Sequence, residues 1–362
     1  MVKNEGQSKT RIILEVILLA SLGILLLVSI LSYIHAQKEG RQGDSESTVP
    51  TFTYSDPSMI GLSISEEGKE VIGTVDPTVI GRATYVKGNA EKAVDLYRDR
   101  GPSQWPENVE TESMLTLVDY GEDQVGCLVD PAYEATYEKI VLYIHGGAYL
   151  MDLSSSVVQC CDDLAMQTHA KFVLPLYRPV FNGTCQDACK FLLDVYKDLL
   201  AEGKEIIIMG ESAGGGLALG FVEYAYSMDV KVPDKMVLVC PWLDATLSNP
   251  EIKDYEERDV LLGVYGLRLL GELWAGDMDV SDSRVSPING QYGPEDEVPD
   301  ALLICGTEEI MYPDTKLLYD KLKEGGHSVQ MVIGEGLFHV YVQTTLPEAL
   351  TTRSIIEEFI LE

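Results

Sequence analysis

The chain has 362 residues, with 27 lysine or arginine and 58 aspartate or glutamate side chains, so its formal net charge is −31 at pH 7. Binding to nucleic acid and adhesion to anionic lipid both depend on basic side chains, so this balance argues against a nucleic-acid partner and against a folded part that adheres to an anionic membrane surface. The length suits one large α/β domain with a tail, or two smaller domains.

The N-terminal segment has the pattern of a membrane anchor. Residues 1–15 carry three basic side chains, and residues 16–34 then contain no charged side chain. About 20 such residues cross the hydrocarbon core of a bilayer, whereas the apolar region of a cleavable signal peptide usually has about 7–15. We therefore predict a cytoplasmic tail over residues 1–15 and a transmembrane signal-anchor helix over residues 16–36. A cleaved signal peptide and a buried core helix are the alternatives.

The charges around this segment predict its orientation. More basic side chains precede it than follow it closely, which favours an N-terminus inside the cell and the bulk of the chain outside. Residues 37–60 are polar and rich in Gly, Ser, Asp, Pro and Thr, which is typical of a flexible spacer. The prediction is a single-pass protein of the cell membrane, whose folded part, residues 61–362, lies on the extracytoplasmic side.

Further along the chain, short apolar runs alternate with longer amphipathic segments. The runs that we expect to form strands are Met114–Tyr120, Val125–Val129, Lys139–Ile144, Phe172–Tyr177, Glu205–Met209, Lys235–Cys240, Ala301–Cys305 and Ser328–Ile333. The segments that we expect to form helices are Glu91–Arg98, Ser154–Thr168, Asp187–Glu202, Leu217–Ala225 and Leu346–Ile360. This alternation predicts an α/β fold with a mostly parallel sheet, whose chemistry lies beyond the carboxyl ends of the strands.

A sharp turn with the pattern Gly210-x-Ser212-x-Gly214 joins the strand over Glu205–Met209 to the following helix. Residues without side chains let the strand end almost on top of the helix start. The turn then holds the serine hydroxyl above the edge of the sheet and places the next backbone N–H at a helix N-terminus. Ser212 is therefore the predicted nucleophile. The alternative is a glycine-rich turn in which the serine has no role.

A serine hydroxyl is a poor nucleophile at neutral pH and needs a base, a task that suits histidine. His339 follows a predicted strand and so lies at the carboxyl edge of the sheet. His145 lies at the same edge but upstream, in a glycine-rich loop. His169 and His327 directly precede strands, at the wrong edge, and His35 lies at the membrane boundary. His339 is the predicted base.

A carboxylate is needed to orient the base and to stabilise its charged form. Four acidic residues follow the carboxyl ends of predicted strands, and their spacing alone does not choose among them: Asp244, Glu308, Glu309 and Asp314. Backbone N–H groups are needed for the oxyanion that develops during acyl transfer. The loop His145-Gly146-Gly147-Ala148 offers such groups, and the predicted oxyanion hole consists of Gly146, Gly147 and Ala213.

The cysteines do not have the spacing of a metal site. There are seven of them and no CxxC pair, and no acidic cluster has the spacing of a calcium loop, so neither a metal nor a cofactor is predicted. Cys240 and Cys305 end apolar runs and are expected to be core residues. If the domain lies outside the cytosol, four others on two nearby segments are candidates for a disulfide: Cys160, Cys161, Cys185 and Cys189.

Together these motifs resemble the hormone-sensitive-lipase-like branch of the α/β-hydrolases, bacterial esterases with an HGG loop, over about Lys139 to Leu361. The stretches that carry the resemblance are the loop His145–Tyr149, the elbow Gly210–Gly215, the segments Trp274–Asp277 and Val285–Pro287, the acid motif Gly306–Ile310 and the histidine motif Gly336–His339. The chain departs from the family pattern twice, with Ala148 in place of the commonest third glycine and with a glutamate in place of the commoner aspartate.

The resemblance implies an α/β-hydrolase fold with a small helical cap from about residues 61–110 and 248–275, in which Leu261–Trp274 forms a helix. It implies Glu309 as the triad carboxylate. The implied function is hydrolysis of short-chain carboxylic esters of the acetyl type through an acyl-enzyme, with a small-molecule ester as the substrate. An amidase or peptidase that uses the same triad, and a catalytically silent ligand-binding module on the same fold, are the alternatives.

Overall fold

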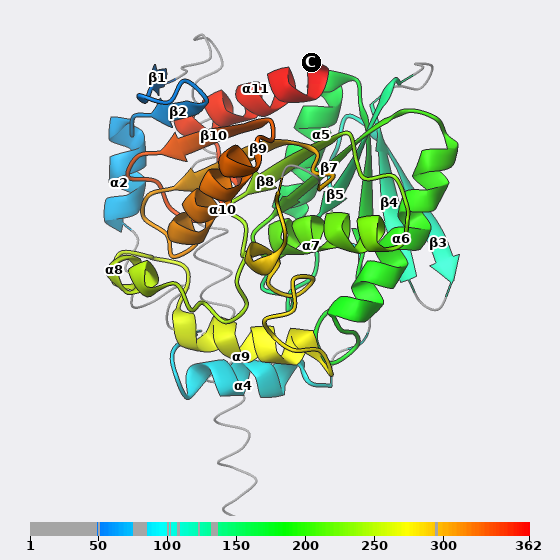
Figure 1. The fold of residues 1–362 in the computed structure, drawn as a ribbon, viewed down its shortest axis with the longest axis horizontal. Helices are drawn as coiled ribbons and strands as arrows, with labels where there is room; N and C mark the ends of the chain where they lie inside the picture. The colour runs from blue at the N-terminus through cyan, green and yellow to red at the C-terminus, as the bar shows by residue number, and fades with distance from the viewer. Residues whose placement is uncertain are drawn as a thin grey trace, which may run out of the picture.

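The computed structural model describes residues 49, 51–74, 85–99, 101, 103–106, 109–121, 124–131, 137–293 and 296–362. In these residues ten strands form one sheet (Figure 1). The strands are β1 (Thr51–Thr53), β2 (Met59–Leu62), β3 (Met114–Gly121), β4 (Gln124–Asp130), β5 (Lys139–Ile144), β6 (Lys171–Leu176), β7 (Glu205–Glu211), β8 (Lys235–Val239), β9 (Asp300–Gly306) and β10 (Val329–Gly334).

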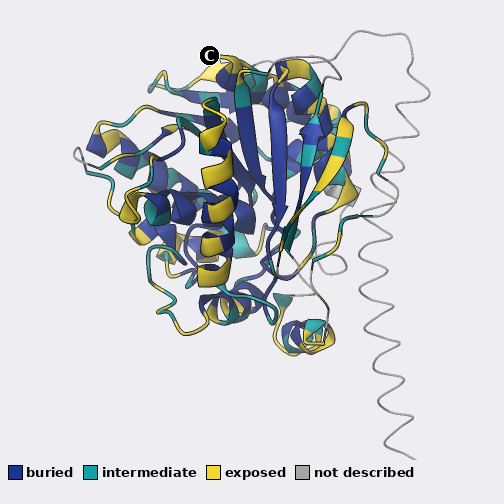
Figure 2. Ribbon diagram, turned by 90° about the vertical axis from the view of Figure 1, so that its right-hand side faces the viewer, coloured by how far each residue is buried: buried dark blue, intermediate teal, exposed yellow. Residues whose placement is uncertain are grey.

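Helices cover both faces of this sheet, as Figures 1 and 2 show. They are α2 (Glu66–Thr74), α4 (Asn89–Tyr97), α5 (Ser155–Thr168), α6 (Cys185–Ala201), α7 (Ala213–Ser227), α8 (Lys253–Glu256), α9 (Val264–Ala275), α10 (Tyr312–Gly325) and α11 (Pro347–Leu361). Helices α6, α7 and α10 lie on one face, and α5 and α11 lie on the other. This is the α/β-hydrolase architecture that the sequence predicts.

The sheet order is β1-β2-β10-β9-β8-β7-β5-β6-β4-β3. The strands from β2 to β6 in this order are parallel, and the three remaining strands pair antiparallel at the two edges. Strand β7 lies in the middle, between β5 and β8. Because the neighbouring strands are parallel, the loops that follow β5, β7, β8, β9 and β10 all leave the same edge of the sheet.

Each central strand contributes to two hydrophobic cores, because successive side chains point to opposite faces. In β5, Ile140 and Leu142 pack with α6 and α7, whereas Val141 and Tyr143 pack with α5 and α11. All four side chains are buried. The continuous apolar runs in the sequence follow directly from this two-sided burial.

The two cores also correct the disulfide hypothesis. Cys160 and Cys161 lie on α5 in one core, and Cys185 and Cys189 lie on α6 in the other, with the sheet between the two pairs. All seven cysteines are free and buried. Closeness in sequence was misleading here, because the strand between the two helices carries the chain from one face of the sheet to the other.

The folded part begins before the predicted end of the spacer. Thr51–Thr53 and Met59–Leu62 form β1 and β2, and β2 pairs in parallel with β10. The prediction of a flexible spacer over residues 37–60 is therefore wrong for Thr51–Thr53 and for Met59 and Ile60. The predicted tail over residues 1–15 and the predicted span over residues 16–36 lie outside the described residues. Within the described part of the chain, no helix combines the length and the apolar character that a membrane crossing requires.

Among the described residues, two packed helices fall in the cap ranges that the resemblance implies. Helix α4 packs against α9, and the two lie side by side beyond the loops of the sheet (Figure 1). Helix α9 covers most of the predicted range Leu261–Trp274. Helix α2, although it falls in the predicted cap range 61–110, packs instead on α11, where the Ser65 N–H donates to the Glu348 carboxylate.

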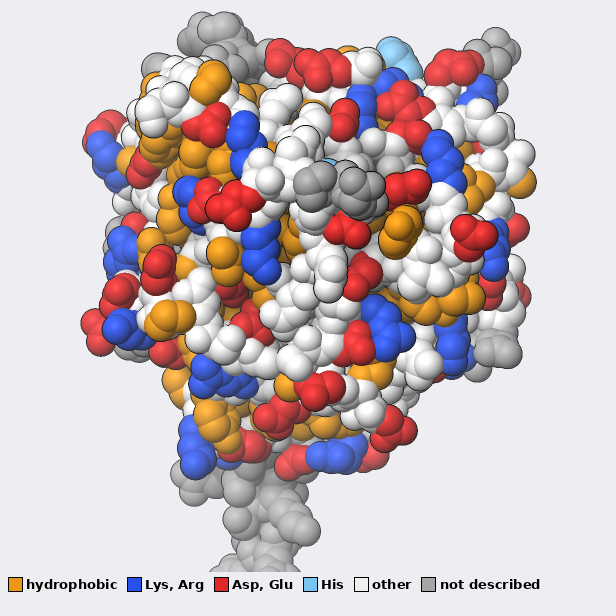
Figure 3. Space-filling model, viewed as in Figure 1, with side chains coloured by type: hydrophobic (Ala, Val, Ile, Leu, Met, Phe, Trp, Pro, Cys, Tyr) orange, Lys and Arg blue, Asp and Glu red, His pale blue; other side chains and the backbone are white. Residues whose placement is uncertain are grey.

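The excess of acidic side chains is spread over the surface. Figure 3 shows acidic and basic side chains interspersed over the face viewed there. Several of them form exposed pairs one helical turn apart, such as Arg98 with Asp95 at 3.2 Å. Exposed pairs of this kind contribute about 0.3–0.5 kcal/mol each at most, so we regard them as a solvated surface and not as a source of stability.

Candidate active site

Ser212 lies at the turn between β7 and α7, with a backbone φ of 53° and ψ of −122°. A non-glycine residue rarely adopts a positive φ, and the surrounding glycines make this one feasible. A Cβ on Gly210 would lie 2.4 Å from the Gly214 carbonyl oxygen, and a Cβ on Gly214 would lie 2.1 Å from the Ile144 carbonyl oxygen. The Gly-x-Ser-x-Gly spacing is therefore a steric requirement of the turn.

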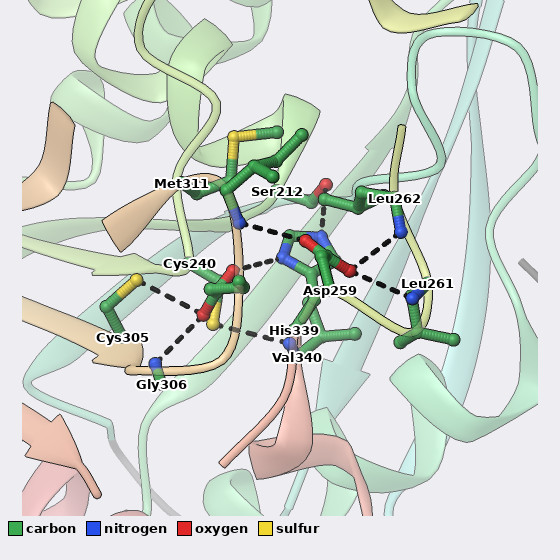
Figure 4. Close-up of polar contacts among 12 residues, drawn as sticks. Ser212, Cys240, Asp259, Leu261, Leu262, Cys305, Gly306, Met311, His339 and Val340 are labelled. Carbon is green, nitrogen blue, oxygen red and sulfur yellow. Dashed lines mark hydrogen bonds and ion pairs between the residues drawn. The ribbon is translucent and has the colours of Figure 1, made fainter. Parts of the chain in front are cut away.

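The base and the acid meet this serine at the same edge. His339 follows β10, and its Nε2 lies 2.9 Å from Ser212 Oγ. Its Nδ1 lies 2.5 Å from Glu309 Oε2, in the loop after β9. Figure 4 shows the imidazole of His339 next to Ser212. Ser212, Glu309 and His339, predicted from three distant parts of the chain, thus form one chain of hydrogen bonds.

The electrostatics of the acid–base pair follow from its burial and its charges. Burial acts to lower the pKa of His339, but the negative charge of Glu309, together with the interactions of the ring with the Glu309 and Cys240 side chains, raises this pKa well above its ordinary value. Burial acts to raise the pKa of Glu309, but the positive charge of His339 and the hydrogen bonds to the carboxylate keep it below its ordinary value. The site therefore stabilises the imidazolium that forms when His339 takes the proton of a serine hydroxyl.

The other acidic candidates have different partners. Glu308 forms an ion pair with Arg258, with 3.1 Å between the Glu308 Oε1 and Arg258 Nη1 atoms. Asp314 accepts a hydrogen bond from the Asn249 side chain at 2.8 Å. Asp244 accepts hydrogen bonds from backbone N–H and hydroxyl groups of its own loop. The geometry therefore selects Glu309 from the four residues that sequence spacing leaves open.

The loop after β5 has an unusual backbone that turns its N–H groups toward the site. Gly147 has a φ of 101°, and Ala148 and Tyr149 have φ values of 54° and 58°. The N–H groups of Gly147 and Ala148 take part in none of the hydrogen bonds found among the described residues. The Ala213 N–H starts helix α7, where it has no carbonyl one turn earlier to bind. The N–H groups of Gly147, Ala148 and Ala213 are therefore available as donors for an oxyanion.

The structure corrects the prediction for Gly146. Its N–H donates to Glu211 Oε1 at 2.7 Å and is therefore not free to bind an oxyanion. The Ala148 N–H, by contrast, has no partner among the described residues. A side chain on Gly146 would meet the Glu211 carbonyl oxygen at 2.8 Å, so the glycine is required for close packing of the loop on the elbow.

Glu211 is a residue of the site whose role the sequence did not reveal. It precedes Ser212, is 4% exposed, and holds the loop through Gly146. Burial raises the pKa of the Glu211 carboxyl to about 7, against hydrogen bonds that lower it. The available signal in the sequence was an acidic residue inside the Gly-x-Ser-x-Gly pattern. A carboxylate in such a tight turn needs a hydrogen-bond partner from the backbone.

We expect Glu211→Gln to retain kcat within about threefold, because the amide oxygen still accepts the Gly146 N–H. Glu211→Ala leaves that buried N–H without a partner, which costs about 1–3 kcal/mol. We expect the alanine variant to lose kcat about tenfold or more, as the loop with the oxyanion donors loosens. Steady-state kinetics with p-nitrophenyl acetate measure both values. Equal activities of the two variants would contradict this role of Glu211.

The same carboxyl predicts a pH dependence of stability. Its pKa rises from 4.5 to about 7 on folding, so between these values the folded state binds more protons than the unfolded state. Glu211 therefore contributes to the free energy of unfolding at low pH. This contribution is lost as the pH rises from 4.5 through about 7. Glu211→Gln removes the titration. Urea unfolding should show the variant gaining stability relative to the parent protein between pH 4.5 and pH 8.

Of the other histidines, His145 is buried beneath the loop. Its Nδ1 lies 2.8 Å from the Gly146 carbonyl oxygen, and its ring stacks on Tyr177 with 4.5 Å between the centroids. Burial lowers the pKa of His145 to about 4, so the ring is neutral at pH 7. His145 is thus a packing residue. His169 is the C-cap residue of α5. The Nε2 atom of His327 lies near the carbonyl oxygens of Tyr292 and Gly293. His35 lies outside the described residues.

Asp259 is a second residue that the sequence did not indicate. Its side chain is fully buried and accepts the N–H groups of Leu261, Leu262 and Ile310 at 2.8–2.9 Å. Burial raises the pKa of the Asp259 carboxyl to about 6, against the positive charge of His339, which lowers it. Because Ile310 directly follows Glu309, Asp259 connects the cap segment to the loop of the acid (Figure 4).

A small hollow lies against the oxyanion loop. It holds about 320 Å³ of empty space, part of which is open to solvent. Its walls are mostly apolar and come from three segments: Ala90 and Val94 of α4, Gly147 and Ala148 of the loop, and Leu270 of α9. The cap therefore closes over one side of the donors and leaves room beside them.

One group of potential metal ligands occurs among the described residues. Atoms of Cys240, Glu309 and His339 lie within 4.8 Å of one another, and all three residues are buried. Glu309 and His339 already share a hydrogen bond there. The group is part of the acid–base pair and not a separate site.

Comparisons with known proteins agree with this geometry. A family model described as the alpha/beta hydrolase fold matches residues 141–343. An esterase from Acinetobacter venetianus is 27% identical over 232 residues, which are 62% of this chain and 76% of that protein. An acetyl-hydrolase from Streptomyces hygroscopicus is 25% identical over 58% of this chain and 71% of its own length. An ethyl acetate hydrolase from Pseudomonas putida is 24% identical over 56% of this chain and 66% of its own length.

Solved structures give the same result. A hormone-sensitive lipase from a metagenome library is 26% identical, with a TM-score of 0.62 over 75% of this chain and 91% of that structure. An esterase from the bacterial hormone-sensitive lipase family superposes with a TM-score of 0.68 over 82% of this chain and 98% of that structure. The second is 19% identical and supports the fold only.

Proposed function

The chain belongs to the α/β-hydrolase fold family, in its hormone-sensitive-lipase-like branch, and is a carboxylic ester hydrolase; from this premise we propose that it hydrolyses short-chain esters of the acetyl type through an acyl-enzyme. The observation that carries the proposal is the distance of 2.9 Å between Ser212 Oγ and His339 Nε2, with Glu309 on the far side of the imidazole.

In the first half of the reaction, Ser212 Oγ attacks the ester carbonyl carbon while His339 Nε2 takes the hydroxyl proton. The imidazolium is stabilised by Glu309, and its proton passes to the departing alcohol. In the second half, His339 takes a proton from water, the hydroxide attacks the acyl-enzyme, and Ser212 is regenerated. No step requires a cofactor.

The negative charge on the carbonyl oxygen is stabilised by backbone donors in both halves. Gly147, Ala148 and Ala213 contribute their N–H groups, and helix α7 adds the positive end of its dipole. Removal of one donor of this kind costs about 10²–10³ in kcat in a serine hydrolase. Because these donors are backbone groups, they are fixed by the turn geometry and cannot be removed by a side-chain substitution.

The hollow beside the donors supports a small substrate. It is narrow and lined mostly by apolar side chains of α4 and α9, so it favours a small acyl or alcohol group over a long chain. The names of two relatives, an acetyl-hydrolase and an ethyl acetate hydrolase, support a small ester. The apolar lining favours an uncharged group.

A larger side chain in the hollow is expected to reduce the length of the acyl group that the enzyme accepts. Leu270→Phe adds volume on the α9 wall, and we expect it to lower kcat/KM for p-nitrophenyl butyrate about tenfold more than for p-nitrophenyl acetate, since one methylene is worth about 1–3 kcal/mol in a pocket. Leu269→Phe, on the same helix but outside the lining, is the matched control. Equal effects on both substrates would show that the hollow does not bind the substrate.

A substrate panel distinguishes this proposal from its rivals. We expect turnover of p-nitrophenyl acetate and little turnover of p-nitroacetanilide, because the amide leaving group is poorer. Faster hydrolysis of the amide would favour an amidase. Absence of labelling by a fluorophosphonate, which reacts with activated serines, would favour a silent ligand-binding module on the same fold.

The membrane attachment is part of the proposal. It rests on the uncharged run over residues 16–34 and on the basic residues before it. We expect the full chain to remain in the membrane fraction after a high-salt wash, to be extracted by detergent, and to be labelled on intact cells by an impermeant fluorophosphonate. Recovery in the soluble fraction would contradict the anchor, and labelling only after cell lysis would contradict the extracytoplasmic side.

A further inference from the structure

We propose that two buried thiols, Cys305 and Cys240, position the acid and the base of the triad, so that this esterase holds Glu309 with a cysteine as well as with the backbone. The inference rests on the proposed function, because positioning has a consequence only if Glu309 and His339 act in catalysis. Neither cysteine touches the substrate, and both act through the residues that they contact (Figure 4).

Cys305 lies in β9, four residues before Glu309, and its Sγ lies 3.1 Å from Glu309 Oε1. An ionised carboxylate only accepts hydrogen bonds, so the thiol donates. The Gly306 N–H donates to the same oxygen at 2.9 Å. Oε1 therefore has two donors, while Oε2 faces His339 Nδ1. Because both oxygens are engaged, the carboxylate cannot rotate away from the imidazole without losing a hydrogen bond.

Cys240 acts on the base from the neighbouring strand. It directly follows β8, and its Sγ accepts the N–H of Val340, the residue after His339, at 3.3 Å. Val340 has a φ of 53°, which a β-branched side chain strongly disfavours. This backbone must be held in place by its surroundings, and the contact with Cys240 is one such restraint next to His339.

The two thiols lie next to each other in the sheet. Val239 of β8 pairs with Ile304 of β9, so the next residues along the two strands are Cys240 and Cys305. Both side chains are fully buried. Burial raises the pKa of the Cys305 thiol well above its ordinary range, so the S–H proton remains in place at neutral pH and can be donated.

The glutamate at position 309 gives a physical reason for this arrangement. A glutamate has one more rotatable bond than the aspartate that is commoner at this position, and so it has more ways to leave the imidazole. An additional donor on Oε1 reduces that freedom. Sulfur suits the position because a small, soft side chain fits a fully packed strand end and still donates.

The first test compares substitutions of Cys305. We expect Cys305→Ala to lower kcat about tenfold with little change in KM, as for loss of one hydrogen bond to a charged group. Cys305→Ser keeps a donor and should restore kcat to within about threefold of the parent protein. Cys127→Ala, which removes a buried strand cysteine far from the site, is the control for a general packing loss. If Cys305→Ala does not fold, Cys305→Val fills the space without a donor and replaces it.

The second test asks whether the thiol acts through the carboxylate. In a Glu309→Ala background there is no carboxylate to hold, so Cys305→Ala should lower the residual kcat by less than about twofold. An equal factor in both backgrounds would show a merely structural role and overturn the proposal. An unchanged kcat in Cys305→Ala would overturn it as well.

The role of Cys240 is tested with its own substitutions in the same assay. Cys240→Ala should lower kcat about threefold to tenfold, and Cys240→Ser, whose hydroxyl also accepts a hydrogen bond, should recover most of it. Retention of full activity by Cys240→Ala would remove Cys240 from the proposal. The proposed function fails in a different experiment, because a Ser212→Ala variant that still hydrolyses esters would disprove the role of the triad whatever the cysteine variants do.

Discussion

Ser212→Ala is expected to lower kcat for p-nitrophenyl acetate by at least about 10⁴-fold. The reason is that the acyl-enzyme cannot form without the hydroxyl that lies 2.9 Å from His339 Nε2. In a comparable serine hydrolase, loss of the nucleophile costs about 10⁶ in kcat, and what remains comes from the oxyanion donors and from binding. The measurement is steady-state hydrolysis at saturating substrate, with the thermal midpoint recorded to show that the variant is folded.

Ser227→Ala is the matched control for this substitution. Ser227 ends the helix that Ser212 precedes, it is exposed, and its hydroxyl donates to the Tyr224 carbonyl within the helix. We expect its kcat to equal that of the parent protein. If Ser212→Ala keeps more than about one hundredth of the parent kcat, the ester is cleaved by another group and the assignment of the nucleophile is wrong.

Glu309→Gln is expected to lower kcat about 10³–10⁴-fold. The amide cannot stabilise the imidazolium, and it can hold the imidazole in the wrong tautomer. The three other acidic residues considered from the sequence serve as controls: Glu308→Gln, Asp244→Asn and Asp314→Asn. Glu308→Gln should be within about twofold of the parent protein, since the Glu308 carboxylate forms an ion pair with Arg258 and accepts a long hydrogen bond from the Thr307 hydroxyl. A larger loss in Asp244→Asn or Asp314→Asn than in Glu309→Gln would refute the assignment of the acid.

The pH profile gives a second readout of the same variant. The negative charge of Glu309 raises the pKa of His339, against burial, which lowers it. Without that charge, burial dominates and the pKa of His339 falls. A base must be neutral to accept a proton, so the acid limb of the kcat/KM profile should move to lower pH in Glu309→Gln. A limb that stays in place or moves to higher pH would show that Glu309 does not set the charge of His339.

Much of the sheet could be predicted because the central strands are buried on both faces. Lys139–Ile144, for example, is an apolar run without alternation, and it forms β5 with the predicted bounds. The edge of the sheet could not be predicted in the same way. Strand β1 is three residues long and all three residues are exposed, so its sequence carries no hydrophobic pattern, and its pairing with β2 depends on tertiary structure.

The residues of the site also differ in how far the sequence could predict them. Ser212 and His339 could be predicted because each follows a strand at the carboxyl edge, and topology brings these ends together. The choice of Glu309 came from a family resemblance, because four acidic residues satisfy the topology. The occupied Gly146 N–H could not be predicted, since it depends on the rotamer of Glu211. Asp259 gave no signal, because its partners are backbone groups.

The most direct measurement of the central claim is the site at which a fluorophosphonate reacts. We expect peptide mass spectrometry of the labelled full chain to find a single adduct on Ser212, an adduct that forms far more slowly in His339→Ala and is absent in Ser212→Ala. An active esterase whose adduct lies on another residue, or which gives no adduct at all, would contradict the assignment of Ser212, His339 and Glu309 as one catalytic unit.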